Sequence, residues 1–368
     1  MIIRHQTRMV QVGPVLIGGQ APIAIQSMNN TDTRDVTATS EQIKRLADAG
    51  CDITRVAIPD LEAAAALARI RSGSPLPIVA DIHFDYRLAL AAIEAGADKI
   101  RINPGNIGGP DRLRQVADAA KARHIPIRVG VNSGSLSKDI LARFGGVNAE
   151  AMVASALEAI SMLEACHFED LVLSIKASEP LLNLEAYRLL AQKTDYPLHI
   201  GVTEAGTLRE GIVRSAVGIG ALLANGLGDT LRVSLTADPV EEVRTAWQIL
   251  RALDLRRRGP RLISCPTCGR TEVDLESVAS AVEERLAECD QPLNVAVMGC
   301  AVNGPGEARQ ADIGLAGGRG FFMIFREGKI LRKVREEDAV EELMREIRKM
   351  CDERRQQEEP RSEEPGIV

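Results

Sequence analysis

The chain has 368 residues, 45% hydrophobic and 26% charged, as expected for a globular protein with a large core and room for two domains. Its formal net charge of -6 argues against a general affinity for nucleic acid, and no apolar run approaches the ~20 residues of a membrane span. The first residues lack the apolar core of a signal peptide, so we expect a cytoplasmic protein. Seven cysteines then indicate metal or redox chemistry rather than disulfides.

Residues 9–20 alternate around Gly13-Pro14, which predicts a small hairpin that would suit the bottom of a barrel. From residue 22 onward, a short apolar strand followed by a helix repeats eight times. The strands are expected at 23–28, 52–58, 77–84, 99–104, 126–132, 171–177, 198–203 and 231–236.

The helical patterns between these strands include 41–50 and 86–96, both of which end in Ala-Gly, a common helix stop. A last helix is expected at 240–253. Eight strand–helix units in about 230 residues predict an α/β protein with a (β/α)8 TIM barrel. An open doubly wound sheet is the alternative, but no Gly-x-Gly-x-x-Gly follows a first strand.

The charged run at 256–261, interrupted by Gly259-Pro260, reads as a linker. We therefore predict a barrel domain with its N-terminal hairpin at 1–257, a smaller α/β domain at 258–355, and a disordered tail at 356–368. The second domain is expected to hold helices at 274–287 and 338–353, strands at 294–298 and 312–315, and a hairpin of 321–325 with 329–333.

Cationic side chains recur near the ends of the predicted strands, where barrel enzymes place their chemistry. They are Arg55, Arg101, Arg128, Lys176, His199 and Arg232. Their polar neighbours are Asp81, His83, Asn103, Asn132, Ser133, Thr203, Glu204 and Ser234.

Any one of these residues is equally well explained as an ordinary exposed strand end. In a closed barrel, however, the cations meet at one mouth, and two charges ~8 Å apart repel by roughly 2 kcal/mol at an effective dielectric of ~20. Asp81 and Glu204 offset part of this repulsion. Arginine binds phosphate oxygens with charge-assisted hydrogen bonds, so we expect a phosphorylated substrate, with a diphosphate favoured.

Cys265 and Cys268 form a Cys-x-x-Cys pair in a turn, and Cys300 lies in a second Gly-rich turn. Three interpretations remain open from the spacing: an iron–sulfur cluster, half of a zinc site, and a redox dithiol or inert cysteines. Glu307, after Asn303-Gly304-Pro305-Gly306, is the candidate fourth ligand. Its carboxylate would exchange more readily than a thiolate and so yield its place to a substrate oxygen. Cys51, Cys166, Cys289 and Cys351 are expected to be buried or incidental.

Several motifs together closely resemble the bacterial 4-hydroxy-3-methylbut-2-en-1-yl diphosphate synthases of the methylerythritol phosphate route to isoprenoids. The resemblance covers nearly the whole chain except the tail, in the short two-domain form. The motifs lie at 27–33, 80–84, 101–106, 128–136, 199–206, 265–270 and 298–307.

The resemblance implies reductive ring opening of 2-C-methyl-D-erythritol 2,4-cyclodiphosphate with loss of water. It implies a [4Fe–4S] cluster, electrons from flavodoxin or ferredoxin, and a homodimer. The implied cluster ligands are Cys265, Cys268, Cys300 and Glu307. The implied substrate-binding residues are Arg55, Arg101, Arg128, Asn132, Lys176, Thr203, Arg232 and Ser234.

Asp81, His83 and Glu204 are candidate proton donors or orienting groups, and Glu307 is expected to matter more for turnover than for cluster assembly. The competing function is a non-redox barrel, such as a pterin- or phosphosugar-binding transferase with a structural zinc. A binding protein without catalysis is a third class, which the mixture of cations and carboxylates makes less attractive.

Overall fold

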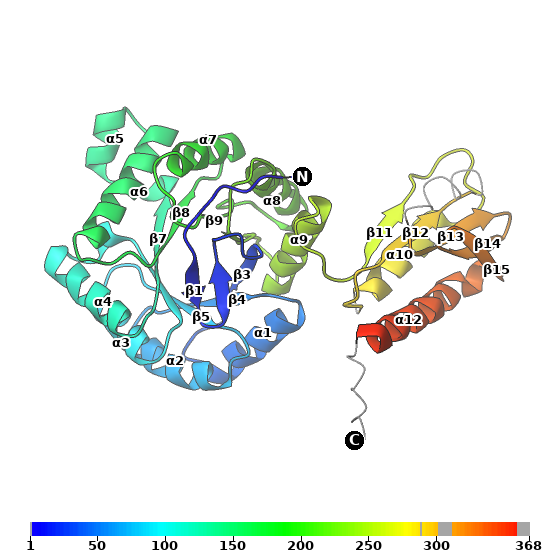
Figure 1. Cartoon of the computed structure of the whole chain (residues 1–368), viewed down its shortest axis with the longest axis horizontal. Coiled ribbons are helices and arrows are strands. Elements are labelled where there is room, and N and C mark those ends of the chain that lie inside the picture. The colour runs from blue at the N-terminus through cyan, green and yellow to red at the C-terminus, as the bar shows by residue number, and fades with distance from the viewer. Residues whose placement is uncertain (1, 288, 301–310, 359–368) are drawn as a thin grey trace, which may run out of the picture. The chain divides into compact units, whose positions relative to one another are not determined.

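The structure is a computed structural model that describes residues 2–287, 289–300 and 311–358. The chain divides into two compact units, with the division between Arg256 and Arg257. Each unit has its own sheet and apolar core. The unit that ends at Arg256 carries the predicted barrel, shown in blue to green in Figure 1.

Eight parallel strands form the barrel in the order β8-β7-β6-β5-β4-β3-β10-β9. A parallel bridge between Leu173 and Leu198 joins β8 to the start of β9 and closes the ring. The predicted TIM barrel is therefore confirmed, followed by a separate α/β unit. The strands are β3 (Ala24–Met28), β4 (Ile53–Ala57), β5 (Ile78–Asp81), β6 (Lys99–Ile102), β7 (Ile127–Asn132), β8 (Leu171–Lys176), β9 (His199–Ile200) and β10 (Thr230–Leu231).

The last two strands are much shorter than the sequence pattern predicts. β9 and β10 pair over two residues each, and beyond them the chain continues as loops. Close approach accounts for the absence of a side chain at Gly201, where a Cβ atom would lie 2.5 Å from the Arg232 carbonyl oxygen. The loops carry Thr203, Glu204 and Ser234 to the carboxyl end of the barrel.

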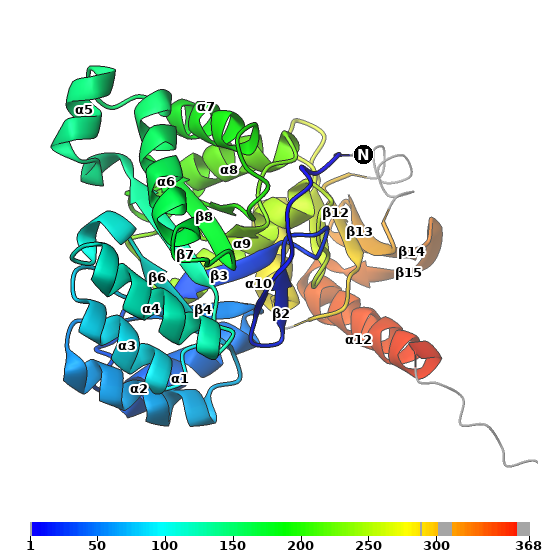
Figure 2. The same cartoon turned by 60° about the vertical axis from the view of Figure 1, so that its left-hand side comes forward.

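Helices surround the strands, and Figure 2 shows α2, α3 and α4 side by side on the outside. Aspartates start the first three helices. The side chains of Asp35, Asp60 and Asp85 accept backbone N–H groups of the first turn. The helices are α1 (Val36–Asp48), α2 (Leu61–Gly73), α3 (Tyr86–Glu94), α4 (Pro110–Ala122), α5 (Lys138–Phe144), α6 (Ala149–Glu164), α7 (Pro180–Ala191), α8 (Leu208–Ala224) and α9 (Pro239–Ala252).

Strand alternation separates an apolar layer from a polar barrel interior. In β6, Ile100 and Ile102 are fully buried in the layer between strands and helices. Side chains alternate across a strand, so Lys99 and Arg101 point the other way, into the barrel. The apolar layer holds the ring together, which leaves the interior available for charged groups.

A hairpin of β1 (Val10–Val12) and β2 (Val15–Ile17) closes the bottom of the barrel. Val12 and Ile17 pack on Ala24, Ile53 and Val79, which lie at or near the starts of their strands. This arrangement matches the plug that the alternation around Gly13-Pro14 suggests. The interior is thereby sealed at the end opposite the predicted site.

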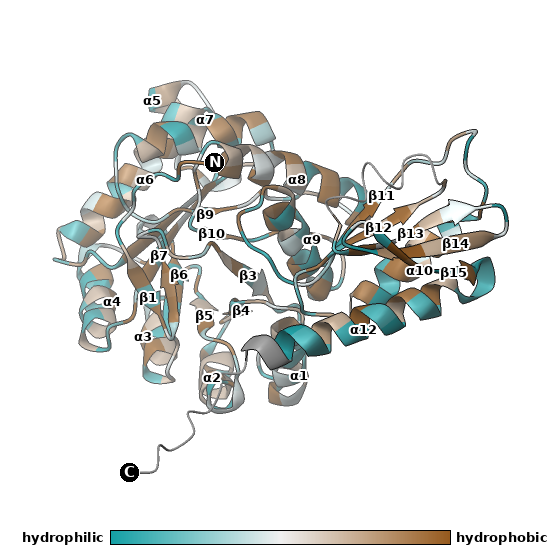
Figure 3. Cartoon of the chain, turned by 45° about the vertical axis from the view of Figure 1, so that its right-hand side comes forward, coloured by the Kyte–Doolittle hydropathy of each residue, from teal (hydrophilic) through white to brown (hydrophobic). Residues whose placement is uncertain are grey.

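The second unit is a five-stranded sheet in the order β11-β12-β13-β14-β15, parallel from β11 to β13 and antiparallel thereafter. Two helices pack on one of its faces. Figure 3 shows hydrophilic residues along the side of α12 that faces the viewer. The elements are β11 (Arg261–Ser264), α10 (Leu275–Leu286), β12 (Asn294–Met298), β13 (Ile313–Gly318), β14 (Phe321–Arg326), β15 (Lys329–Arg335) and α12 (Ala339–Glu358).

Two features of this unit differ from the sequence prediction. β11 was not expected; its four residues pair with β12 before the cysteine turn. Helix α12 runs to Glu358, three residues into the segment predicted to be disordered, and the rest of that segment lies outside the described residues. The predicted hairpin turn is present, with positive φ at both Glu327 and Gly328. None of the helices in the described part of the chain is long and apolar enough to cross a membrane.

The hairpin plug predicts a stability difference between two neighbouring residues. Ile17 is fully buried, whereas Leu16 is 41% exposed. We expect Ile17→Ala to lower the free energy of unfolding of the barrel by about 2–5 kcal/mol because it leaves a cavity. Leu16→Ala should cost much less. Urea denaturation followed by the fluorescence of Trp247, which is the sole tryptophan and lies in α9, measures both. Equal losses would contradict the proposed plug.

Candidate active site

The barrel interior gathers six cationic side chains from five strands or strand ends. Five of them are at most 9% exposed, and Arg232, which follows β10, keeps a 19% exposed side chain. The predicted cations therefore meet inside one ring rather than on unrelated faces. The six are Arg55, Lys99, Arg101, Arg128, Lys176 and Arg232, of which Lys99 was not predicted.

Two glycines make room for these long side chains. A Cβ atom on Gly130 would lie 2.5 Å from Arg101 Nε, and one on Gly201 would lie 2.7 Å from Lys176 Nζ. Such contacts are too short for any real side chain. The neighbouring strands thus have no side chain at the two inward positions beside Arg101 and Lys176.

Asp81 is the carboxylate at the end of β5. Its Oδ1 accepts a hydrogen bond from Arg101 Nη1 at 3.2 Å, and its Oδ2 lies 3.4 Å from His83 Nε2. Burial opposes ionisation, but Arg55, His83 and Arg101 outweigh it, so the pKa of Asp81 lies well below its usual value. Asp81 is therefore ionised and orients Arg101, which argues against its predicted alternative role as a proton donor.

Several buried cationic or polar atoms have no hydrogen-bond partner among the described residues. They include Lys99 Nζ, Arg128 Nε and Nη1, and His199 Nε2. Burial and the neighbouring cations lower the pKa of Arg55 to about 10, and they lower the pKa values of Lys99, Arg128 and Lys176 well below their usual values. A bound anion would relieve both the repulsion and the missing hydrogen bonds.

His199 differs from the expectation that it contributes a positive charge. It is fully buried, with Nδ1 3.4 Å from Thr230 Oγ1. Burial, reinforced by Lys176 and Arg128, lowers its pKa well below the usual value, so the ring is neutral. We assign His199 to the packing of the interior rather than to anion binding.

The remaining predicted residues lie at the carboxyl ends of the strands, at the rim. Glu204 is exposed and adopts a left-handed backbone (φ 53°), an uncommon conformation for a residue with a side chain. Its Oε2 accepts a hydrogen bond from Ser178 Oγ at 3.4 Å. His83 is also exposed, and the half-buried members of the rim are Asn103, Asn132, Ser133, Thr203 and Ser234.

Glu242 of α9 belongs to the site but was not predicted. It is 3% exposed, and its carboxylate accepts a hydrogen bond from Arg232 Nη2 at 3.0 Å. The available signal was its place on the buried face of an amphipathic helix, one turn before Ala246 and two before Ile249. A glutamate at such a position needs a partner.

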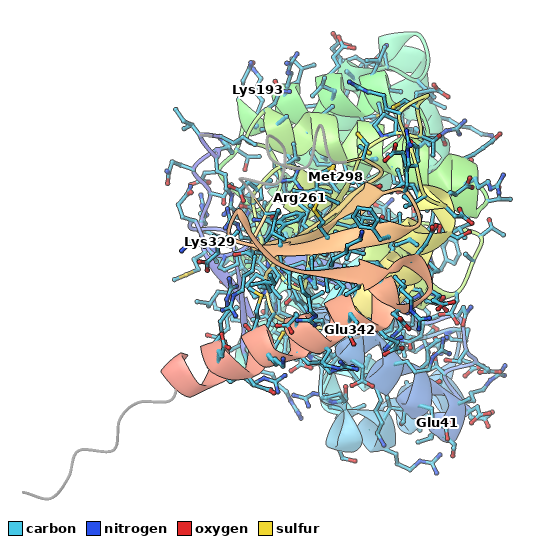
Figure 4. All side chains as sticks on the ribbon, turned by 90° about the vertical axis from the view of Figure 1, so that its right-hand side faces the viewer. Glu41, Lys193, Arg261, Met298, Lys329 and Glu342 are labelled. Atoms are coloured by element: carbon cyan, nitrogen blue, oxygen red, sulfur yellow. The ribbon has the colours of Figure 1, made fainter. Side chains whose placement is uncertain are left out.

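Two of the predicted ligands in the second unit, Cys265 and Cys300, lie at the same end of its sheet. β11 and β12 are parallel neighbours, so Cys265 and Cys300, which follow them, emerge at the same end. The Gly299 N–H points to Cys265 Sγ at 3.3 Å. Figure 4 labels Met298, which ends β12 at this end of the sheet.

Cys268 occupies the turn that follows Cys265. Its N–H donates to Thr271 Oγ1 at 3.1 Å, and the Glu272 N–H donates to the Gly299 carbonyl at 3.2 Å, so the turn is tied to the Cys300 segment. Hydrogen bonds from the backbone and side chain of Arg270 lower the pKa of the Cys268 thiol. A lowered pKa favours the thiolate, the form that binds metal.

The chemistry of this donor set, though not its spacing, is that of an iron–sulfur group. Cys265, Cys268 and Cys300 are all free thiols, and thiolates are the usual ligands of such clusters. Within the described residues, no group of three His, Cys, Asp or Glu side chains is close enough to hold a metal ion. Glu307, the predicted fourth ligand, lies outside the described residues.

The crowded cations predict a link between anion binding and stability. We expect inorganic diphosphate to raise the melting temperature of the protein, by an amount equivalent to about 2.7 kcal/mol at 100 times its Kd. Arg128→Met should raise the melting temperature in the absence of anion, because it removes a buried cation that is 2% exposed, and should weaken the response to diphosphate. Differential scanning calorimetry measures both effects.

Arg123→Met is the matched control for this measurement, because Arg123 is exposed at the end of α4. It should leave the response to diphosphate unchanged. If Arg128→Met responds to diphosphate as strongly as the unaltered protein, Arg128 is not part of the anion site.

Comparison with known proteins matches a family model to each of the two units. Residues 7–247 match the GcpE TIM-barrel domain, and residues 261–349 match the GcpE protein C-terminal domain. Among solved structures, a type I 3-dehydroquinate dehydratase from Clostridium difficile covers 67% of this chain and 98% of its own, with a TM-score of 0.50 and 14% identity. That likeness reflects the barrel fold alone.

Curated relatives match over nearly the full length. A protein of Maridesulfovibrio salexigens named 4-hydroxy-3-methylbut-2-en-1-yl diphosphate synthase (flavodoxin) is 58% identical, covering 97% of this chain and 100% of its own. A protein of Ruminiclostridium cellulolyticum with the same name is 57% identical, covering 95% and 99%. The chain therefore belongs to the GcpE family of 4-hydroxy-3-methylbut-2-en-1-yl diphosphate synthases.

Proposed function

We infer that this protein is an iron–sulfur oxidoreductase of isoprenoid biosynthesis that makes 4-hydroxy-3-methylbut-2-en-1-yl diphosphate. Its substrate is 2-C-methyl-D-erythritol 2,4-cyclodiphosphate, which two electrons open reductively with loss of water. Identity of 58% over the full length of a relative with this name carries the inference. The buried cations of the barrel agree with it independently, because they demand an anionic ligand.

We propose that the barrel interior and its rim bind the cyclic diphosphate. Arg128 and Lys176 supply buried positive charge, and Arg101 is already oriented by Asp81. Fixed cations of this kind bind phosphate oxygens and also stabilise the negative charge that develops when the ring opens. The full proposed set is Arg55, Arg101, Arg128, Asn132, Lys176, Thr203, Arg232 and Ser234.

We propose that Cys265, Cys268, Cys300 and Glu307 hold a [4Fe–4S] cluster in the unit that starts at Arg257. When bound, such a cluster delivers electrons one at a time. The support is the common end of the sheet from which Cys265 and Cys300 emerge, and the lowered pKa of Cys268. In functional terms, residues 1–257 then form the substrate domain and residues 258–355 the cluster domain.

The charged rim residues suggest how protons are handled. Asp81 is ionised and accepts hydrogen bonds, so we assign it the role of orienting Arg101 and His83. His83 and Glu204 are exposed at the mouth and remain the proposed proton donors. The left-handed backbone of Glu204 supports a functional role, because such strain persists where a side chain must be aimed.

The remaining proposals concern partners and location. The relatives' names specify flavodoxin, which we propose as the electron donor here, with ferredoxin as the alternative. A homodimer, which the family resemblance of the sequence implies, and a cytoplasmic location, as expected in the sequence analysis, are also proposed.

Turnover tests the function directly. Oxygen-free protein should contain iron and sulfide and should convert the cyclic diphosphate when reduced flavodoxin is supplied. Zinc without sulfide, together with no turnover, would favour the non-redox alternative. Protein that was exposed to air and stripped of iron serves as the matched inactive control.

The proposed cluster ligands predict that replacing Cys300 lowers the iron and sulfide content, whereas replacing Cys289 does not. Cys300→Ser should lower iron and sulfide content severely, because it removes a thiolate from the proposed ligand set. Cys289→Ser is the control, since Cys289 Sγ lies 3.5 Å from Cys351 Sγ in the apolar core, away from the proposed ligands. Metal and sulfide analysis of anaerobic protein compares the two. Full iron content in the Cys300 variant would remove it from the ligand set.

Glu307 should affect turnover more than assembly. Glu307→Ala leaves three thiolates, so we expect most of the iron to be retained while the turnover rate falls by at least about tenfold, the usual loss for a group acting at the reacting centre. Iron analysis and turnover on the same anaerobic sample give both values. Undiminished turnover would exclude the proposed role.

A further inference from the structure

Glu242 makes four hydrogen bonds at the edge of the cation cluster. Arg232 donates to it twice, from Nη2 to Oε1 at 3.0 Å and from Nε to Oε2 at 3.3 Å. Ser27 Oγ donates to Oε2 at 3.0 Å, and the Leu235 N–H donates to Oε1 at 3.1 Å. One carboxylate of α9 therefore joins β3, Arg232 and the loop that follows β10.

Arg232 needs this partner because its neighbours repel it. Arg55, Arg128 and Lys176 are close enough for mutual repulsion with Arg232 to lower their pKa values. A guanidinium without a fixed acceptor in such a field would turn toward solvent. The forked geometry of two parallel N–H···O contacts fixes both the position and the plane of Arg232.

The same device appears once more in the barrel. Asp81 binds Arg101, whereas the hydrogen-bond acceptor of Arg55 among the described residues is a weak one, Met28 Sδ, at 2.8 Å from Nη2. The described cations thus divide into two arginines anchored by buried carboxylates and others whose hydrogen bonds are left for a ligand. Glu242 therefore holds Arg232 in the same way that Asp81 holds Arg101, as a buried carboxylate acceptor.

We propose that Glu242 is a positioning residue for the reaction: it holds Arg232 in the orientation that receives the diphosphate and couples it through Ser27 to β3. This role rests on the proposed function of the barrel. Glu242 does not contact the reacting atoms in this scheme, so its loss should act through Arg232.

A structural explanation for Glu242 is stabilisation of the helix start, because acidic groups in the first turn favour the helix dipole. Glu241 lies in the same first turn, on the exposed side, where it pairs with Arg244. Glu241→Gln removes the same charge from the same turn without touching Arg232. It is therefore the matched control.

The test compares Glu242→Gln with Glu241→Gln in the cluster-loaded protein. We expect Glu242→Gln to raise KM for the cyclic diphosphate about 10- to 100-fold, the scale of a displaced binding group, with a smaller change in kcat. Glu241→Gln should leave both constants unchanged. In an Arg232→Gln background, Glu242→Gln should add less than about twofold, because the group it positions is already gone.

An unchanged KM in Glu242→Gln, or a full further loss in the Arg232→Gln background, overturns the proposal. Calorimetric binding of the cyclic diphosphate to the unaltered protein distinguishes failure of the proposed function from failure of the positioning role. If the unaltered protein does not bind it, the proposed function is wrong. If the unaltered protein binds it and the Glu242 variant is unaffected, only the positioning role is wrong. If Glu242→Gln does not fold, Ser27→Ala is decisive. It should raise KM about threefold, as expected for one lost hydrogen bond, and an unchanged KM again overturns the proposal.

Discussion

The mutual repulsion of the buried cations is the main physical constraint on the barrel, because the rest of the structure must offset it. Six lysines and arginines enter one ring, and two buried carboxylates, Asp81 and Glu242, offset only part of their charge. At an effective dielectric of ~20, each close pair costs roughly 2 kcal/mol. The apolar layer between strands and helices must supply the stability that the interior does not. Gly130 and Gly201 carry no side chain at the places where Arg101 and Lys176 lie.

A different constraint shapes the second unit. Adjacent parallel strands bring residues far apart in sequence to the same end of a sheet, and β11 beside β12 does this for Cys265 and Cys300. The turn that holds Cys268 is then tied back to Gly299 through the Glu272 N–H. Backbone pairing thus sets where Cys265 and Cys300 emerge, and hydrogen bonds from Arg270 favour the thiolate at Cys268.

Much of the barrel was predictable because its strands show a recognisable pattern of alternating residues. The cations that point inward occupy positions of that same pattern. The eight strands, the hairpin and the convergence of the arginines were all predicted from this two-residue alternation. Glu242 was not predicted, because the partner of a helix glutamate is known only once α9 has packed against β3 beside Arg232. The neutrality of His199 and the ionisation of Asp81 depend on burial and on neighbours from other strands, which no local pattern contains. β11 was missed because four residues beside a linker carry too little pattern.

The charge imbalance also bears on selectivity. Counted as charged, six cations and two carboxylates leave four positive charges uncompensated at the mouth, so a monoanion would leave most of the repulsion in place. A diphosphate brings at least two negative charges on closely spaced oxygens, which matches arginines fixed on different strands. Anchoring Arg101 and Arg232 to carboxylates keeps these two groups in place before the ligand arrives, which lowers the ordering cost of binding. Asp81 and Glu242 reduce the net positive charge of the interior, but they also strengthen ligand recognition, because they hold Arg101 and Arg232 in fixed orientations.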